Sequence, residues 1–332
     1  MKIIFIQLLL ISFSFSQNEV CFEVEPNPFP NNPSLSSFTQ YVNVLDCIYI
    51  YGESQINEQK MLHAASVAAE LLDNNEDSIV DDLLVKTALQ SSNVIIPIFN
   101  SEWSSGQDNL EEDFEGCLGA VLYRNEIDPS QPGHWGYDAT IEEILHTINY
   151  CGQLAVYPDV FGLAPNSSLM SEAMDIARGG QFINIPNQYP EEAWYHYDDW
   201  TCDYECMAME YLYWCIVSDM GILDNTQTCN GIYNEWELCT PELFYSTDIS
   251  MHEIVNHPDY KLPQIAPDGN YCPNNIVLGD VNGDMIANIL DVIQTINMIL
   301  GVTETNIIAD INNDMLVNVL DVILIIQIIV NE

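Results

Sequence analysis

A short segment, Tyr137–Tyr150, carries two glutamates and a histidine at a spacing that suits metal chemistry. Glu142 and His146 are four residues apart, so a helix would place both side chains on one face. Glu143 directly follows Glu142 and would point about 100° further round the helix. Two ligands at this spacing, with a carboxylate next to the first, can hold a metal ion and take a proton from water. The segment therefore predicts a metal-assisted hydrolytic site.

A third ligand and a hydrogen-bond donor are expected further along the chain. The pattern of Asp203–Asp219 predicts a helix in which apolar and aromatic residues flank Glu210. A carboxylate drawn into the interior needs a partner, which a metal would supply. Before this helix, His196 is a candidate to stabilise an oxyanion, with Tyr195 and Tyr197 as alternatives. The predicted zinc ligands are Glu142, His146 and Glu210, and the predicted catalytic residues are Glu143 and His196.

The same residues also have a purely structural interpretation. Thr140 followed by Glu143 is the pattern of a capping box, which starts a helix without any chemistry. The stripe formed by Tyr211, Tyr213 and Trp214 is typical of core packing. The metal hypothesis therefore depends on whether the folded chain brings its three ligands together.

The elements expected before this site alternate between strands and helices. Apolar runs predict strands at Cys47–Tyr51, Val94–Phe99 and Leu118–Tyr123, and apolar residues at helical spacing predict helices at Glu58–Leu72 and Asp81–Leu89. Pro97 cannot donate to a sheet ladder, so its strand is expected at an edge or with a bulge. The element order is thus strand, helix, helix, strand, strand and ligand-bearing helix.

With this order, residues 44–219 resemble a zincin-like metallopeptidase of the Glu-zincin arrangement. The motif reads Glu142-Glu143-Ile144-Leu145-His146, so glutamate replaces the first histidine of HExxH. The resemblance implies an α+β fold, a Zn²⁺ cofactor and peptide hydrolysis. The replacement puts zinc affinity in question, because a carboxylate softens the preference for zinc without forbidding it.

A twelve-residue pattern of oxygen-bearing side chains occurs twice near the C-terminus, with an offset of 30 residues. Aspartate or asparagine stands at loop positions 1, 3, 5, 9 and 12, and position 7 would offer a backbone carbonyl. Ca²⁺ prefers six to eight hard oxygen ligands. The predicted ligands of two Ca²⁺ ions are Asp280, Asn282, Asp284, Ile286, Asn288 and Asp291, and then Asp310, Asn312, Asp314, Leu316, Asn318 and Asp321.

Each of these loops leads into an apolar segment, 292–300 and 322–330, expected to form two packed helices. From residue 278 to the C-terminus the chain resembles a type I dockerin domain. The resemblance implies a small all-α fold and docking to a cohesin-like or cell-surface protein. The sequence departs from the dockerin pattern at loop position 6, where Met285 and Met315 replace glycine. A non-glycine residue with positive φ costs about 1 kcal/mol. The alternative is that the repeat no longer binds ions and contributes only to the packing of its two helices.

A third acidic turn lies between the first two predicted helices. Asp73, Asn75, Asp77 and Asp81 match the first half of a calcium loop, but Leu84 at position 12 cannot bind a cation. The alternative is a turn whose side chains cap the next helix. Both interpretations stay open at this point.

The N-terminal 16 residues have a positive start, an apolar run and a small-residue cleavage pattern, which predicts a signal peptide and a secreted or cell-surface protein. All 10 cysteines follow it, and an even number in an exported chain predicts disulfides. Cys202 and Cys206 have zinc ligation as an alternative. The predicted parts are a signal peptide (1–16), an N-terminal extension (17–43), a zincin-like domain (44–265), a linker (266–277) and a dockerin-like domain (278–332).

The charge balance excludes several classes of partner. The chain has 6 Lys+Arg against 50 Asp+Glu, a net charge of −44. Nucleic-acid binding is excluded, since neutralising phosphates requires basic side chains. No segment predicts a membrane span, and we expect a monomer. The excess of acid suits cation binding or solubility in salt.

Three functions are compatible with these patterns. The first is a secreted metal-dependent hydrolase, most simply a peptidase. The second is a non-catalytic extracellular binding or assembly protein that keeps a degenerate zincin fold. The third is a dockerin-bearing polysaccharide-degrading enzyme, for which the 50 acidic residues offer no unique carboxylate pair.

Overall fold

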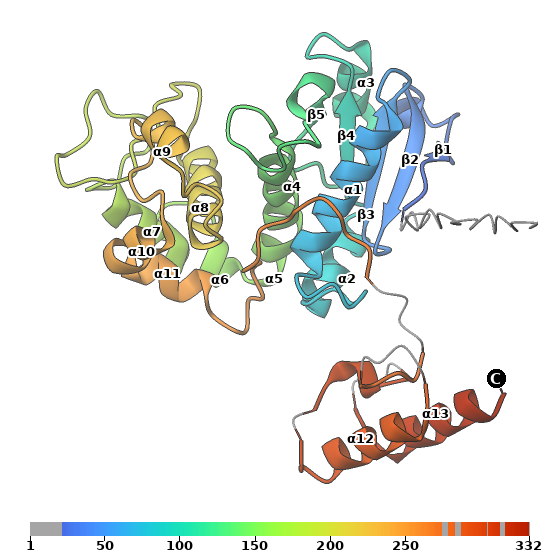
Figure 1. Ribbon diagram of the computed structural model, residues 1–332. Helices are drawn as coiled ribbons and strands as arrows, with labels where there is room; N and C mark the ends of the chain where they lie inside the picture. Colours follow the sequence, from blue (N-terminus) through green and yellow to red (C-terminus); the bar gives the residue numbers. More distant parts are fainter. Residues whose placement is uncertain (1–21, 274–277, 283–286, 304, 313–315, 332) are drawn as a thin grey trace, which may run out of the picture.

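The computed structural model describes residues 22–273, 278–282, 287–303, 305–312 and 316–331. The predicted signal peptide and the predicted ligands Asp284, Ile286 and Asp314 lie outside these residues. The described chain is a mixed α/β structure with a five-stranded sheet and many helices (Figure 1). The strands are β1 (Glu25–Pro26), β2 (Phe38–Val44), β3 (Ile48–Glu53), β4 (Ile95–Phe99) and β5 (Leu122–Tyr123).

The helices follow the strands and then dominate the second half of the chain. The α-helices are α1 (Glu58–Leu72), α2 (Leu83–Ser91), α3 (Ser105–Asp113), α4 (Thr140–Ile148), α5 (Leu154–Val156), α6 (Pro158–Phe161), α7 (Leu169–Ala177), α8 (Tyr204–Asp219), α9 (Thr226–Ile232), α10 (Pro241–Thr247), α11 (Ile249–Val255), α12 (Ile289–Ile299) and α13 (Val319–Asn331). Shorter turns of helix are η1 (Pro33–Leu35), η2 (Arg124–Glu126), the π-helix η3 (Asn149–Gln153) and η4 (Ile307–Ala309).

The strands lie in the order β1-β2-β3-β4-β5, antiparallel as far as β3 and parallel from β3 to β5. Leu45 and Asp46 both have positive φ, and they form the tight turn between β2 and β3. All of β2 except Val44 falls inside the predicted N-terminal extension, so that region contributes a strand to the sheet.

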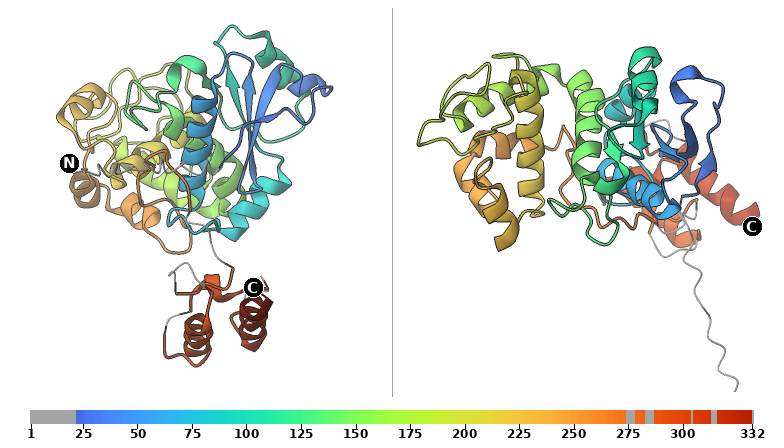
Figure 2. Two further views of the ribbon diagram at one scale, coloured as in Figure 1. Left: turned by 45° about the vertical axis from the view of Figure 1, so that its right-hand side comes forward. Right: turned by 90° about the horizontal axis from the view of Figure 1, so that it is seen from above.

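Helix α1 covers one face of the sheet, and the predicted bounds of this helix are confirmed. Asn57 caps it by accepting a hydrogen bond from the Lys60 amide, and 11 of its 15 residues are buried. On the side of α4 away from the sheet, α7 to α11 gather into a helical group around α8 (Figures 1 and 2). Helix α4 therefore lies between the sheet and this helical group.

Two strand predictions need correction. The strand expected over Leu118–Tyr123 is confined to Leu122–Tyr123. A disulfide to Cys151 and a close approach of Gly119 to α4 hold the preceding residues away from the sheet. β4 is not an edge strand, although it contains Pro97. β5 pairs only with the last two residues of β4, so Pro97 interrupts no ladder on that side.

Part of the predicted linker is attached to the α/β region. The amides of Gly269 and Asn270 donate to the Glu70 carboxylate, and the Tyr271 hydroxyl donates to Asp73. Tyr271 is buried and stacks on Phe22. The predicted linker spans residues 266–277, and its first half is therefore packed against the α/β region.

The prediction of disulfides is confirmed. Pairs form between Cys117 and Cys151, between Cys202 and Cys206, and between Cys229 and Cys239, and Cys272 is also disulfide-bonded. Zinc ligation by the second pair is thereby excluded in this structure. Cys47 and Cys215 are buried free thiols.

Helices α12 and α13 form a hairpin with a core of its own. Its buried residues are Val281, Val292, Met298, Ala309, Val322 and Ile325. No helix in the described ranges is long and apolar enough to cross a membrane.

Candidate metal centre

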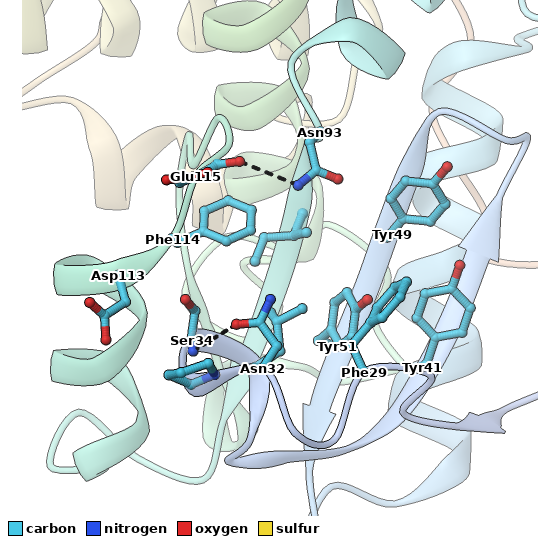
Figure 3. Close-up of a pocket in the computed structure, with 13 residues that line it drawn as sticks. Phe29, Asn32, Ser34, Tyr41, Tyr49, Tyr51, Asn93, Asp113, Phe114 and Glu115 are labelled. Atoms are coloured by element: carbon cyan, nitrogen blue, oxygen red, sulfur yellow. Dashed lines mark hydrogen bonds between the residues drawn. The ribbon is translucent and has the colours of Figure 1, made fainter.

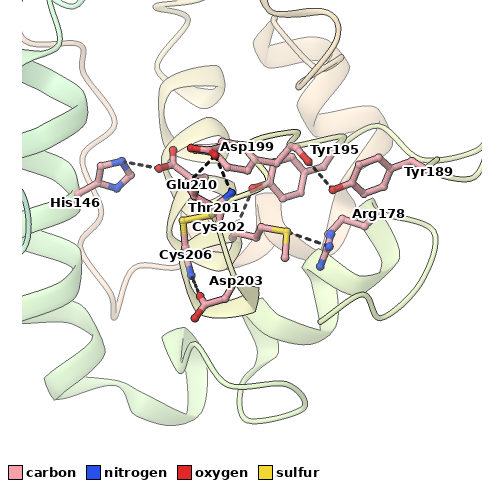
Figure 4. The surroundings of a disulfide bond; sticks show 12 residues. His146, Arg178, Tyr189, Tyr195, Asp199, Thr201, Cys202, Asp203, Cys206 and Glu210 are labelled. Carbon is pink, nitrogen blue, oxygen red and sulfur yellow. Dashed lines mark hydrogen bonds and ion pairs between the residues drawn. A yellow bond between two sulfur atoms is a disulfide. The ribbon is translucent and has the colours of Figure 1, made fainter. Parts of the chain in front are cut away.

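Three predicted ligands meet where α4 faces α8. Oxygen or nitrogen atoms of Glu142, His146 and Glu210 all lie within 4.8 Å of one another. His146 from α4 points toward Glu210 from α8, with 3.5 Å between Nε2 and Oε1 (Figure 4). Among the described residues this is the cluster of acidic, histidine or cysteine side chains that could hold a metal. The predicted convergence of 142, 146 and 210 is thus present.

The spacing of these atoms suits a small divalent cation. Ligands 2.0–2.2 Å from a tetrahedral zinc lie about 3.4 Å from each other. The separation of 3.5 Å between His146 and Glu210 is close to this value. Nδ1 of His146 is buried and bonded to no described residue, whereas Nε2 faces Glu210, so Nε2 is the ring nitrogen placed to meet a metal ion. One imidazole and two carboxylates are ligand types that zinc accepts.

Burial is the largest influence on the ionisation of these groups. Burial raises the pKa of Glu142 and of Glu143 above the usual carboxyl range; His146 opposes the rise and Glu210 adds to it. Burial alone would lower the pKa of His146, but its contact with Glu210 outweighs this and raises the pKa. Three carboxylates thus share a confined space with one imidazole, and a divalent cation would compensate their charge.

The start of α4 is organised by Asp138 rather than by the predicted capping box. The helix begins at Thr140 after Ala139, which makes no side-chain capping bond. The Thr140 hydroxyl donates to Oδ1 of Asp138 instead, and Oδ2 of Asp138 lies 3.0 Å from Nε2 of His63. Because Glu143 plays no part in capping, the capping-box prediction is wrong and its carboxylate is available to the cavity.

The start of α8 is held by a cap and a disulfide. The Asp203 carboxylate accepts a hydrogen bond from the Cys206 amide, and Cys206 is bonded to Cys202 (Figure 4). Deeper in the helix, the Met207 carbonyl accepts the hydroxyl of the buried Tyr195. These contacts fix the turn that precedes Glu210.

A cavity of about 410 Å³ opens beside two of the three ligands, His146 and Glu210, and Glu143 also lines it. Glu142 is not among the described residues that line it. The lining includes Gly119, whose position has room for no side chain: an added Cβ would lie 2.4 Å from the Thr147 Cα. The candidate base and two ligands therefore face one cavity, closed on one side by the segment that precedes β5.

The predicted oxyanion residue His196 lies elsewhere. Its Nε2 is 2.8 Å from the Ala193 carbonyl oxygen, and it is absent from the described lining of the cavity. Tyr195 is fully buried and bonded to Met207. Tyr197 is also absent from the described lining of the cavity, although the charge of Glu210 adds to the rise in pKa that burial causes. The oxyanion donor therefore stays a prediction for His196 and for both tyrosines.

No known family model, curated protein or solved structure matches this chain. The assignment of the α4–α8 centre therefore depends on the geometry and chemistry of its own residues.

A larger cavity, of about 760 Å³, lies over the sheet face of Tyr41, Tyr49 and Tyr51 (Figure 3). Asp113 and Glu115 also line it, but no histidine or cysteine does among the described residues. Its chemistry therefore does not match the α4–α8 centre.

The acidic turn after α1 is closed by its own hydrogen bonds. The Asp73 carboxylate accepts from the amides of Asp77 and Ser78, and Asp81 accepts from the amide of Asn74. Asp82 caps α2, which begins at Leu83 rather than at the predicted Asp81. Asn75 donates to Asp77 within the turn. The capping interpretation is confirmed for residue 82, and calcium binding by Asp73, Asn75, Asp77 and Asp81 stays a prediction.

The two C-terminal loops have the same internal bonding. Asp291 accepts from the amides at loop positions 2, 3 and 9, namely those of Val281, Asn282 and Asn288. Asp321 accepts from the equivalent amides of Ile311, Asn312 and Asn318. Asp280 and Asp310 at position 1 are buried. The described parts of the two loops thus share the same hydrogen bonds to the carboxylate at position 12.

Sequence reasoning missed the residues that complete the α4–α8 cavity. Tyr150, Leu163 and Met209 line it together with Glu205. Glu205 and Met209 lie one turn apart on α8, the helix that also carries the predicted ligand Glu210. Their position on this helix is the sequence signal that could have identified them. Leu163 comes from a loop after α6, and no local pattern indicates its position.

Proposed function

We propose that this protein is a secreted, zinc-dependent hydrolase, a zincin-like peptidase. The observation that carries the proposal is the meeting of Glu142, His146 and Glu210 next to a cavity. Two of these ligands, His146 and Glu210, line that cavity together with Glu143. Glu142, His146 and Glu210 would hold the ion. When bound, zinc would supply Lewis-acid activation of water and of a substrate carbonyl.

The protein's own residues would do the remaining work. The Glu143 carboxylate faces the cavity and would take a proton from the attacking water, then return it to the leaving amine. The packed walls around His146 would keep bulk water from the reacting groups.

Substituting the ligand on α8 tests the metal assignment. We expect Glu210→Gln to weaken zinc binding by more than about 100-fold, because loss of a direct ligand exceeds the effect of losing an outer-sphere partner. Zinc would be measured by mass spectrometry of the purified protein and by competition with a fluorescent chelator. Glu242→Gln, an exposed glutamate in the first turn of α10, is the matched control.

Unchanged zinc content in Glu210→Gln would contradict this centre. Zinc binding without hydrolysis of casein, gelatin or quenched peptides would instead favour the non-catalytic binding protein. Release of reducing sugars from a glycan panel would favour the polysaccharide-degrading alternative.

For the C-terminal module we propose a dockerin-like domain that binds two Ca²⁺ ions. The matching hydrogen bonds of Asp291 and Asp321 support this, because they close both loops in the same way. Many apolar side chains of α12 and α13 are exposed, including Ile293 and Ile323. Such a face suits docking to a cohesin-like or cell-surface protein.

Calcium titration calorimetry tests this module. In the Glu210→Gln background, which removes the α4–α8 centre, we expect two ions to bind. Asp280→Ala and Asp310→Ala should each remove one, because each deletes the position-1 ligand of one loop. At 100 times the Kd, binding adds about 2.7 kcal/mol per site to stability. Binding of three ions would assign the third ion to the Asp73 turn. Binding of no ion would show that the C-terminal repeat contributes only to helix packing.

A further inference from the structure

The α4–α8 cavity has an apolar wall and an acidic rim. Leu163 is nearly buried and Met209 partly buried, and both line the cavity with Tyr150. Glu205 also lines it but is exposed to solvent. The cavity therefore offers an apolar surface that ends at a carboxylate.

Helix α8 sets the distance between that carboxylate and the reacting groups. Glu205 and Glu210 are five residues apart, which corresponds to about 7.5 Å along the helix axis and about 140° around it. Met209 lies between them, one turn from Glu205, and all three line the cavity. A side chain that crosses α8 obliquely from the reacting centre would cover Met209 and reach Glu205.

No lysine or arginine is among the described residues that line the cavity, and His146 is their one basic side chain. Arg178 is fully buried beside Phe182 and Met207, and Lys60 donates to backbone carbonyl oxygens. A bound zinc ion would compensate its own ligands and leave the rim acidic.

We propose that this cavity takes the side chain of a lysine or arginine next to the scissile bond, with Glu205 as the residue that determines specificity. The stem of a basic side chain would pack on Leu163 and Met209, and its charged end would reach Glu205 at the solvent edge. An acidic side chain is disfavoured, because it would add to the negative charge. The proposal rests on the peptidase function proposed above.

Quenched fluorescent peptides that differ at one residue beside the scissile bond test the proposal. We expect kcat/KM for the lysine peptide to exceed that for the norleucine peptide by about fivefold, the upper range for an exposed ion pair. Glu205→Gln should bring this ratio close to one, and sodium chloride should lower it in the wild type. Glu242→Gln, equally exposed in a first helical turn, should leave the ratio unchanged.

The outcomes separate this proposal from the proposed function. Hydrolysis without a preference for lysine, or a preference that survives Glu205→Gln, would overturn the specificity and leave the peptidase function intact. If no peptide is cleaved, the peptidase function is overturned, and the specificity is tested by the binding of the same peptides. In that case fluorescence anisotropy should show tighter binding of the lysine peptide than of the norleucine peptide, with the difference lost in Glu205→Gln. Equal binding would overturn the specificity as well.

Discussion

Replacing Glu143 with glutamine is expected to lower kcat/KM for peptide hydrolysis by about 10²–10⁴-fold, the usual contribution of a positioned general base. Glutamine keeps the shape of the side chain but cannot accept the proton of the attacking water. Glu143 takes no part in capping α4 and lines the same cavity as His146 and Glu210. Its substitution should therefore affect proton transfer more than folding. Steady-state kinetics with a quenched peptide would measure the effect.

The neighbouring glutamate provides the control for this substitution. Glu142→Gln removes a predicted ligand, so it should lower both zinc content and hydrolysis. Glu143→Gln should lower hydrolysis alone and bind the normal amount of zinc. Equal zinc loss in both variants would show that Glu143 is a ligand instead of a base. Full activity in Glu143→Gln would rule out its role as the base.

Elements with a strong local pattern were predictable from the sequence. Helix α1 has apolar residues at helical spacing and Asn57 as its cap, and its bounds agree with the prediction. The strand predicted at Leu118–Tyr123 is shorter because Gly119 packs against Thr147, a contact that no local pattern encodes. Strand β2 is not predicted, because its buried residues Phe38, Val42 and Val44 do not alternate regularly with exposed ones.

The ligand set was predictable from helical spacing on α4 and from the apolar surroundings of Glu210 on α8. Glu142 and His146 share one face of α4, and the apolar neighbours of Glu210 indicate that α8 is buried. His196 belongs to an irregular stretch whose path depends on distant contacts, such as that of its amide with the Glu235 carbonyl. Residue type alone could therefore not place His196 relative to the cavity.

Replacing Asp138 with alanine is expected to lower the free energy of unfolding by about 3–5 kcal/mol, the usual effect of breaking a buried charge pair. Asp138 is 4% exposed, and its carboxylate accepts from the amides of Asp128 and Gly133 and from the Thr140 hydroxyl. It also pairs with the buried His63. Alanine would leave these groups buried without a partner. Urea unfolding followed by circular dichroism would measure the loss.

The pH dependence of the loss in unfolding free energy identifies the part that comes from the charge of Asp138. Burial would raise the pKa of Asp138, but hydrogen bonds from His63, Thr140 and Gly133 outweigh burial and lower it. The stabilisation is then complete above the ordinary aspartate pKa of about 3.9 and is lost as pH falls through the lower folded value. Asp259→Ala, at an exposed position, should change stability by less than about 0.5 kcal/mol at any pH. A similarly small loss for Asp138→Ala would mean that the loop before α4 holds its shape without this carboxylate. In that case the position of Glu142 and His146 would depend on the packing of α4 between the sheet and α8.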